Sequence, residues 1–231
     1  SRFVTAAESA PQGRVWTVFE NGRAATKVDL LILGDGYSEA ELPKFHKDVE
    51  RMVKVLFEHE PFKSRRSDFN VRAIDLPTPK SGVNRPRTGD FRRTPLGVSY
   101  NIFDSERYAL TLDNRSVRDV AAAAPYDFLE ILINEEHYGG GGIFNDHATA
   151  AVDTAFAEYI FVHEFGHHFA ALGDDYYTSD VAYETGVADR PEPWEPNVTA
   201  LKDPANLKWK DLVESGTPVP TPWEKAAYEA K

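Results

Sequence analysis

The chain has 231 residues and a formal net charge of −11 at pH 7, because 37 acidic side chains outnumber 26 lysine and arginine side chains. Nucleic acids and anionic membrane surfaces repel an acidic protein, so neither class of partner is expected. The absence of cysteine excludes disulfides, thiolate zinc sites and thiol catalysis, and no apolar run approaches the ~18 residues that span a bilayer. The length predicts one large domain over residues 1–231.

The N-terminal part of the chain contains two strand patterns. Residues 15–19 have strand character and lead into Asn21 and Gly22, a pair typical of hairpin turns, within an N-terminal extension of residues 1–27. Residues 28–33 form an apolar run that predicts a buried strand. We therefore expect a strand that enters a hairpin turn, followed by a strand of the core.

A helix and a further strand are predicted next. Ser38 and Glu41 have the spacing of a capping box, in which each side chain can satisfy the other's free backbone N–H. Apolar residues then recur at helical spacing over residues 42–56, and residues 69–74 form a strand pattern. The proline- and arginine-rich residues 78–98 predict a solvated loop.

The second half of the chain continues the alternation. Residues 117–124 are compatible with a helix, 128–133 with a buried strand, and four glycines follow at 139–142. Residues 154–172 form a continuous helix-compatible run, whereas the polar, proline-rich residues 178–231 predict an irregular C-terminal part. This order of elements predicts an α/β fold with a largely parallel sheet.

The last predicted helix contains the pattern H-E-x-x-H at His163, Glu164 and His167. Helical residues four apart lie about 40° apart around the axis and ~6 Å apart along it, so both imidazoles can bind one metal ion. Glu164 is then placed to take a proton from a metal-bound water as general base. The alternative is a pair of hydrogen-bonded core histidines, which would be costly in an apolar run if unpaired.

A catalytic zinc ion needs a third protein ligand. Asp174 is the first choice and Asp175 the alternative, and the carboxylate that does not bind would orient an imidazole. A continued helix would carry Asp174 ~10 Å beyond His167, so the chain must reverse before it. Gly173 can adopt the left-handed conformation that such a reversal needs.

Three further side chains beside these ligands have two interpretations each. Tyr176 and Tyr177 can donate a hydrogen bond to a developing oxyanion or pack in the core. His168 points to another helix face and is expected to be packed, or to support a ligand. A calcium site formed by Asp180 with the two earlier aspartates is disfavoured, because the spacing does not match an EF-hand loop.

The segment HEFGHHFAALGDDYY resembles the zinc helix of the bacterial IgA-peptidase-type zinc metallopeptidases, a branch of the metzincin-like enzymes. LLILGDGYSEAEL is similar to that family's first strand and the start of its helix, EPFKSRRSDFNV to its second strand, and YGGGGIFND to its glycine-rich edge strand. The likeness spans residues 28–177. It implies a metzincin-like zincin catalytic domain with a twisted, mostly parallel sheet, an antiparallel edge strand and a long zinc-binding helix.

The resemblance implies a zinc-dependent endopeptidase that hydrolyses peptide bonds of protein or peptide substrates. On this basis His163, His167 and Asp174 would bind Zn²⁺, and Glu164 would be the catalytic base. The family's chemistry therefore agrees with the roles that the helical spacing suggests.

The glycine-rich stretch would border the cleft, where an extended substrate can pair with a sheet edge. The residues implied in substrate binding are Gly140, Gly141, Gly142 and Ile143. The resemblance also implies a secreted, cell-surface or periplasmic location. The alternative function is a catalytically inert, metal-holding binding or adhesion module of a secreted protein.

Two features depart from the metzincin pattern H-E-x-x-H-x-x-G-x-x-H/D. Its glycine position holds Ala170 here, and its third-ligand position holds Gly173, which has no side chain, so the ligand is displaced to Asp174 or beyond. Metzincins also carry a methionine turn after the zinc helix, whereas the one methionine here is Met52. We therefore expect a further C-terminal segment beyond Lys231 to supply that turn.

Overall fold

The computed structural model describes residues 13–174, 191–222, 224, 226–227 and 230. The chain divides into two compact units, Ser1–Ala170 and Ala171–Lys231. The three named α-helices and all named β-strands belong to the first unit, whereas the second contains the short 3₁₀ turns Pro204–Asn206 and Lys210–Leu212. Within the described ranges, no helix is long and apolar enough to cross a membrane.

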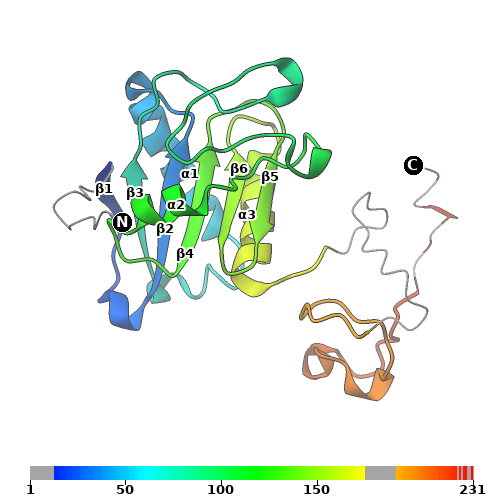
Figure 1. Cartoon of the computed structure of the whole chain (residues 1–231). Helices are drawn as coiled ribbons and strands as arrows, with labels where there is room; N and C mark the ends of the chain where they lie inside the picture. Colours follow the sequence, from blue (N-terminus) through cyan, green and yellow to red (C-terminus); the bar gives the residue numbers. More distant parts are fainter. Residues whose placement is uncertain (1–12, 175–190, 223, 225, 228–229, 231) are drawn as a thin grey trace, which may run out of the picture. The chain divides into compact units, whose positions relative to one another are not determined.

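The first unit is built on a six-stranded sheet with the order β1-β3-β2-β4-β6-β5 (Figure 1). Its strands are β1 (Arg14–Phe19), β2 (Val28–Asp35), β3 (Phe69–Asp75), β4 (Phe128–Ile133), β5 (Gly140–Ile143) and β6 (His147–Ala151). The four central strands run parallel, while β1 and β5, one at each edge, run antiparallel to their neighbours. This arrangement confirms the predicted α/β class with a mostly parallel sheet and an antiparallel glycine-rich edge.

Helices cover both faces of the sheet (Figure 1). The helices are α1 (Leu42–Leu56), α2 (Asn114–Ala121) and α3 (Ala157–Ala170). Leu30 and Ile32 of β2 pack in one core with α1 and α3, whereas Leu31 and Leu33 pack in a second core with α2. Because both faces are covered, the middle of a central strand such as β2, residues 30–33, is apolar with no polar alternation.

The predicted hairpin after β1 is wrong. β1 pairs with β3, which follows it by about fifty residues in the chain, and not with β2. The side chain of Asn70 explains the difference, because its Oδ1 accepts the backbone N–H groups of Asn21 at 2.8 Å and Gly22 at 3.2 Å. The Asn-Gly turn is therefore held against β3, and the chain continues from this turn to β2 on the other side of β3.

β6 is a strand that sequence analysis did not predict. Its residues, HATAA, are fully buried, but alanine has little preference for strands, so the pattern gives a weak signal. Ala150 belongs to the core shared with α3. Small side chains at this edge of the sheet let α3 pack close to it.

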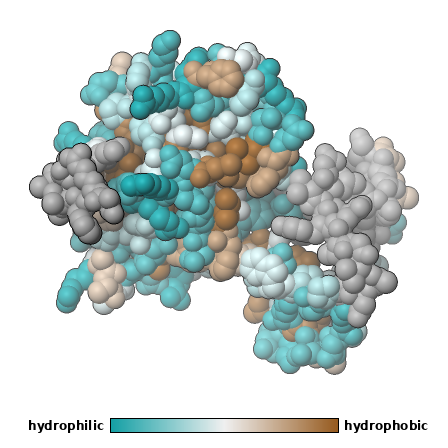
Figure 2. Space-filling view, viewed as in Figure 1, coloured by the Kyte–Doolittle hydropathy of each residue, from teal (hydrophilic) through white to brown (hydrophobic). Residues whose placement is uncertain are grey.

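In the view of Figure 2, hydrophilic residues cover most of this unit and surround an apolar patch over β5 and β6.

A buried carboxylate, Asp35, connects the end of β2 to the predicted loop. It accepts hydrogen bonds from Thr94 Oγ1 at 2.7 Å, from the Val98 N–H at 2.9 Å and from the Leu96 N–H at 3.4 Å. Burial raises the pKa of Asp35 from 3.8 to about 6, and these hydrogen bonds only partly offset that effect.

We expect the Asp35 carboxyl to make stability depend on pH. Its folded-state pKa is raised, so the stabilisation it gives is complete below pH 3.8 and is lost as the pH rises through 6. Between about pH 4 and pH 7 this loss amounts to about 2 kcal/mol of unfolding free energy. Urea unfolding of the wild type and of Asp35→Asn across this range measures it, and a pH-independent difference between the two proteins would contradict it.

Candidate metal centre

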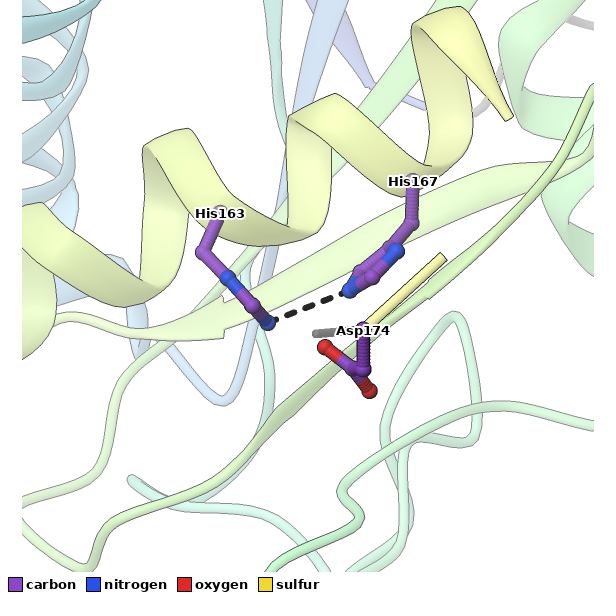
Figure 3. Close-up of side chains that lie close together, drawn as sticks. All are labelled: His163, His167 and Asp174. Carbon is purple, nitrogen blue, oxygen red and sulfur yellow. Dashed lines mark hydrogen bonds between the residues drawn. The ribbon is translucent and has the colours of Figure 1, made fainter. Parts of the chain in front are cut away.

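His163, His167 and Asp174 converge on one point (Figure 3). Each offers a ligand atom, and the three atoms lie within 4.8 Å of one another. The two Nε2 atoms are 3.1 Å apart. In the described part of the chain, this is the one group of three or more His, Asp or Glu side chains found close enough to hold a metal ion.

The donor set fits a catalytic zinc ion. Two nitrogens bound at ~2.0–2.1 Å to a tetrahedral ion lie about 3.3 Å apart, close to the separation seen here. Two imidazoles and one carboxylate are also a ligand set that zinc enzymes use, with a fourth position left for water or substrate. The three side chains could therefore hold zinc with little rearrangement.

α3 places the histidines as the helical spacing predicts, but the helix is shorter than expected and reverses elsewhere. It spans Ala157–Ala170 and not residues 154–172. The left-handed residue after it is Ala171, with φ 57°, whereas Gly173 is not in the left-handed region. The prediction of a reversal at Gly173 is therefore wrong. A non-glycine residue held in this conformation pays a steric cost that the surrounding structure must offset.

Gly173 is held by its neighbours in the second unit. Its N–H donates to Asn197 Oδ1 at 2.7 Å and its C=O accepts from Asn197 Nδ2 at 2.8 Å. A Cβ at this position would lie 2.9 Å from Val198 Cγ2, so a larger residue would not fit without movement. These contacts fix the backbone next to Asp174.

α3 lies directly on the glycine-rich strand. A Cβ on Gly142 would overlap the backbone oxygen of Glu164 and lie 2.8 Å from the Cβ of His167. A Cβ on Gly140 would lie 2.7 Å from Ile160 Cγ2 and 3.4 Å from Glu164 Cγ. The glycines are therefore needed for space, because they let the strand lie directly beneath Glu164 and His167.

We expect Gly142→Ala to lower the free energy of unfolding by about 1–3 kcal/mol, since the added methyl group must displace the helix backbone. The same displacement should weaken zinc binding, because His167 moves with the helix. Urea unfolding and zinc titration measure the two effects. Gly22→Ala is the matched control, since the three atoms nearest to its Cβ all belong to the flexible side chain of Lys27. Equal stability of the two variants would contradict the close packing described here.

Among the described residues, the outer edge of β5 is paired at Gly140 and has no backbone partner at Gly142. The N–H of Gly140 donates to Arg107 O at 3.1 Å, and its C=O accepts from the N–H of Ala109 at 3.3 Å. Backbone groups alternate in direction along an antiparallel strand, so those of Gly142 also point away from β6. The other two predicted substrate-binding residues are Gly141, whose Cβ would meet Leu110, and Ile143, which is partly exposed.

His168 is buried on a different face of α3, as predicted for a packed histidine. Its Nε2 accepts the N–H of Leu129 in β4 at 3.1 Å, so Nδ1 carries the proton that is donated to Ile143 O at 3.0 Å. Burial lowers the pKa of His168 to about 4, which keeps the ring neutral. It thus connects α3 to the strands β4 and β5.

Two side chains near the centre were not identified from the sequence. Glu130 is fully buried on β4, and its carboxylate oxygens have no hydrogen-bond partner among the described residues. Burial, and to a lesser extent the charge of Glu164, raises its pKa well above the usual value. The sequence signal that could have identified Glu130 is a single carboxylate inside an otherwise apolar strand. Tyr159, four residues before His163, stacks on that imidazole with ring centroids 5.4 Å apart.

Three predicted site residues fall outside the part of the chain that the structure describes. They are Asp175, the alternative third ligand, and the two candidate oxyanion donors Tyr176 and Tyr177. Their predicted roles therefore stay predictions, and only Asp174 of the two candidate aspartates can be placed beside the imidazoles.

The chain was also compared with models of known protein families. A family model described as IgA Peptidase M64 matches residues 17–231, which is most of the chain. A comparison with curated proteins finds no match. The matched region includes the whole six-stranded sheet apart from the first residues of β1, and all three residues of the metal centre.

Proposed function

The chain belongs to the IgA Peptidase M64 family, and from this premise we propose that it is a zinc-dependent endopeptidase acting on protein substrates. One observation carries the proposal beyond the family: His163, His167 and Asp174 converge on one point, with Glu164 beside His163 on the same helix. This is the arrangement of two imidazoles, a third ligand and a general base that metal-dependent peptide hydrolysis needs.

Each residue then has a defined task in hydrolysis. A zinc ion held by the three ligands would lower the pKa of a water molecule and polarise the scissile carbonyl. Glu164 takes a proton from the attacking water and returns it to the leaving amine. Tyr159, stacked on His163, keeps that imidazole in its orientation.

The substrate backbone is proposed to pair with the open edge of β5. The pairing is proposed at Gly142, whose outward backbone groups have no hydrogen-bond partner among the described residues, because Arg107 and Ala109 already pair with Gly140. A helix bearing the metal ligands, laid on an antiparallel glycine-rich edge strand, also supports the metzincin-like arrangement that we propose for the domain. Main-chain pairing of this kind gives affinity without requiring a particular substrate sequence.

The direct test is digestion of a panel of denatured proteins by the zinc-loaded full chain, with products identified by mass spectrometry. We expect cleavage that stops when a chelator is added and resumes when zinc is restored. An inert metal-holding module would bind zinc and leave the panel intact. Full zinc loading with no cleavage of any panel member would therefore favour that alternative and contradict the endopeptidase.

A further inference from the structure

Exposed aromatic rings lie beside the metal centre. Tyr138, Phe156 and Tyr159, here called the aromatic cluster, have exposed fractions of 36%, 61% and 57%. Tyr138 precedes β5, and its ring packs edge-on against Phe156 with centroids 6.2 Å apart. Large apolar side chains gathered at the surface next to a binding site commonly contact a ligand, because their burial then contributes to affinity.

The aromatic cluster continues the helix face that carries the ligands. Phe156, Tyr159, His163 and His167 are separated by three, four and four residues, which places them within about 80° of one another around the axis. The turn that contains Phe156 is already helical in its bonding, since the N–H of Ile160 donates to Phe156 O at 2.9 Å. A chain that reaches the metal ligands along this face therefore also passes the aromatic rings.

The direction of β5 decides which part of a substrate meets these rings. Ile160 lies over Gly140 and His167 lies over Gly142, so helix and strand run in the same direction. The aromatic cluster is therefore at the beginning of β5, where Arg107–Ala109 prevents further backbone pairing. A substrate paired antiparallel to β5 at Gly142 would run toward that end with its C-terminal part. There it can make side-chain contacts but no further strand pairing.

We propose that the aromatic cluster is an apolar subsite that selects an aromatic or large aliphatic side chain on the C-terminal side of the scissile bond. The inference rests on the proposed peptidase function and adds a substrate preference to it. The assignment to the C-terminal side of the scissile bond assumes that the substrate pairs antiparallel to β5, because antiparallel pairing is the more stable arrangement per residue.

The experiment uses peptides that differ only in carrying Phe or Ser at the first position after the cleaved bond. For the wild type, kcat/KM should be about tenfold higher for the Phe peptide. Phe156→Ala and Tyr138→Ala should each remove most of this ratio and leave cleavage of the Ser peptide nearly unchanged. Phe91→Ala is the matched control, because Phe91 is a ring of similar exposure (72%) on a loop remote in sequence, and should keep the full ratio.

A binding measurement separates this inference from the peptidase proposal. Fluorescence anisotropy with the Glu164→Gln chain should show tighter binding of the Phe peptide, and Phe156→Ala in the same background should remove the difference. Equal binding and cleavage of the two peptides, a preference on the N-terminal side of the bond, or a ratio unaffected by both variants would overturn the subsite. Selective binding without cleavage by the wild type would support the subsite and contradict the peptidase.

Discussion

Glu164→Gln should lower the rate of peptide hydrolysis by a factor of about 10²–10⁴, while the protein keeps its zinc. The glutamine amide has nearly the same size as the carboxylate, but it cannot accept a proton from the attacking water. His163 and His167 remain one helical turn apart, so the ligand geometry is unchanged. Single-turnover kinetics with a peptide substrate and metal content by mass spectrometry measure the two quantities together.

Glu158→Gln is the matched control for this substitution. Glu158 lies on the same helix, its side chain is 58% exposed, and its ion pair with Arg51 is long, at 3.9 Å. We expect its variant to retain wild-type turnover. If Glu164→Gln hydrolysed peptides at the wild-type rate, Glu164 would not be the base. If the variant lost its zinc, its lower rate would reflect the loss of the metal, and the role of general base would not be supported.

The parts of the structure that could be predicted from the sequence are those that depend on local spacing. The i and i+4 positions of His163 and His167 fix their common helix face whatever the rest of the chain does. The apolar runs of β2 and β4 likewise identify strands covered on both faces. The prediction of Asp174 as third ligand also required a reversal of the chain, and it stays a prediction; in the structure its carboxylate lies within 4.8 Å of the imidazole nitrogens.

The features that could not be predicted depend on contacts between distant segments. β1 pairs with β3, because the side chain of Asn70 accepts a hydrogen bond from the turn at Asn21 for which a hairpin was predicted. The reversal occurs at Ala171, since propensity favours glycine there but does not decide where the helix ends. Four glycines in a row suggest a loop or an edge, yet only the position of α3 shows why Gly142 has no room for a side chain.

Asp174→Ala should weaken zinc binding by more than the roughly 10–100-fold that loss of an outer hydrogen-bonding partner costs, because it removes one of three ligands. When zinc is limiting, the rate of hydrolysis should fall in proportion to the fraction of protein that still binds zinc. The carboxylate of Asp174 is exposed and lies with the two imidazole nitrogens inside 4.8 Å, so its loss leaves no buried charge and should not unfold the protein. Zinc titration followed by a competing chelator measures the affinity, and circular dichroism checks the fold.

Asp175→Asn separates the two aspartates that the sequence offers as third ligand. If Asp174 binds the metal, Asp175→Asn should change zinc affinity by less than about tenfold, which is the lower range for a residue that only orients a ligand. Asp174→Asn adds a second distinction, since an amide keeps the size of the side chain but loses the negative charge that offsets a divalent ion. A large loss of affinity in Asp175→Asn, with Asp174→Ala near the wild type, would transfer the ligand role to Asp175. That result would also mean that the left-handed residue Ala171 brings Asp174 close to the imidazoles without making it a ligand.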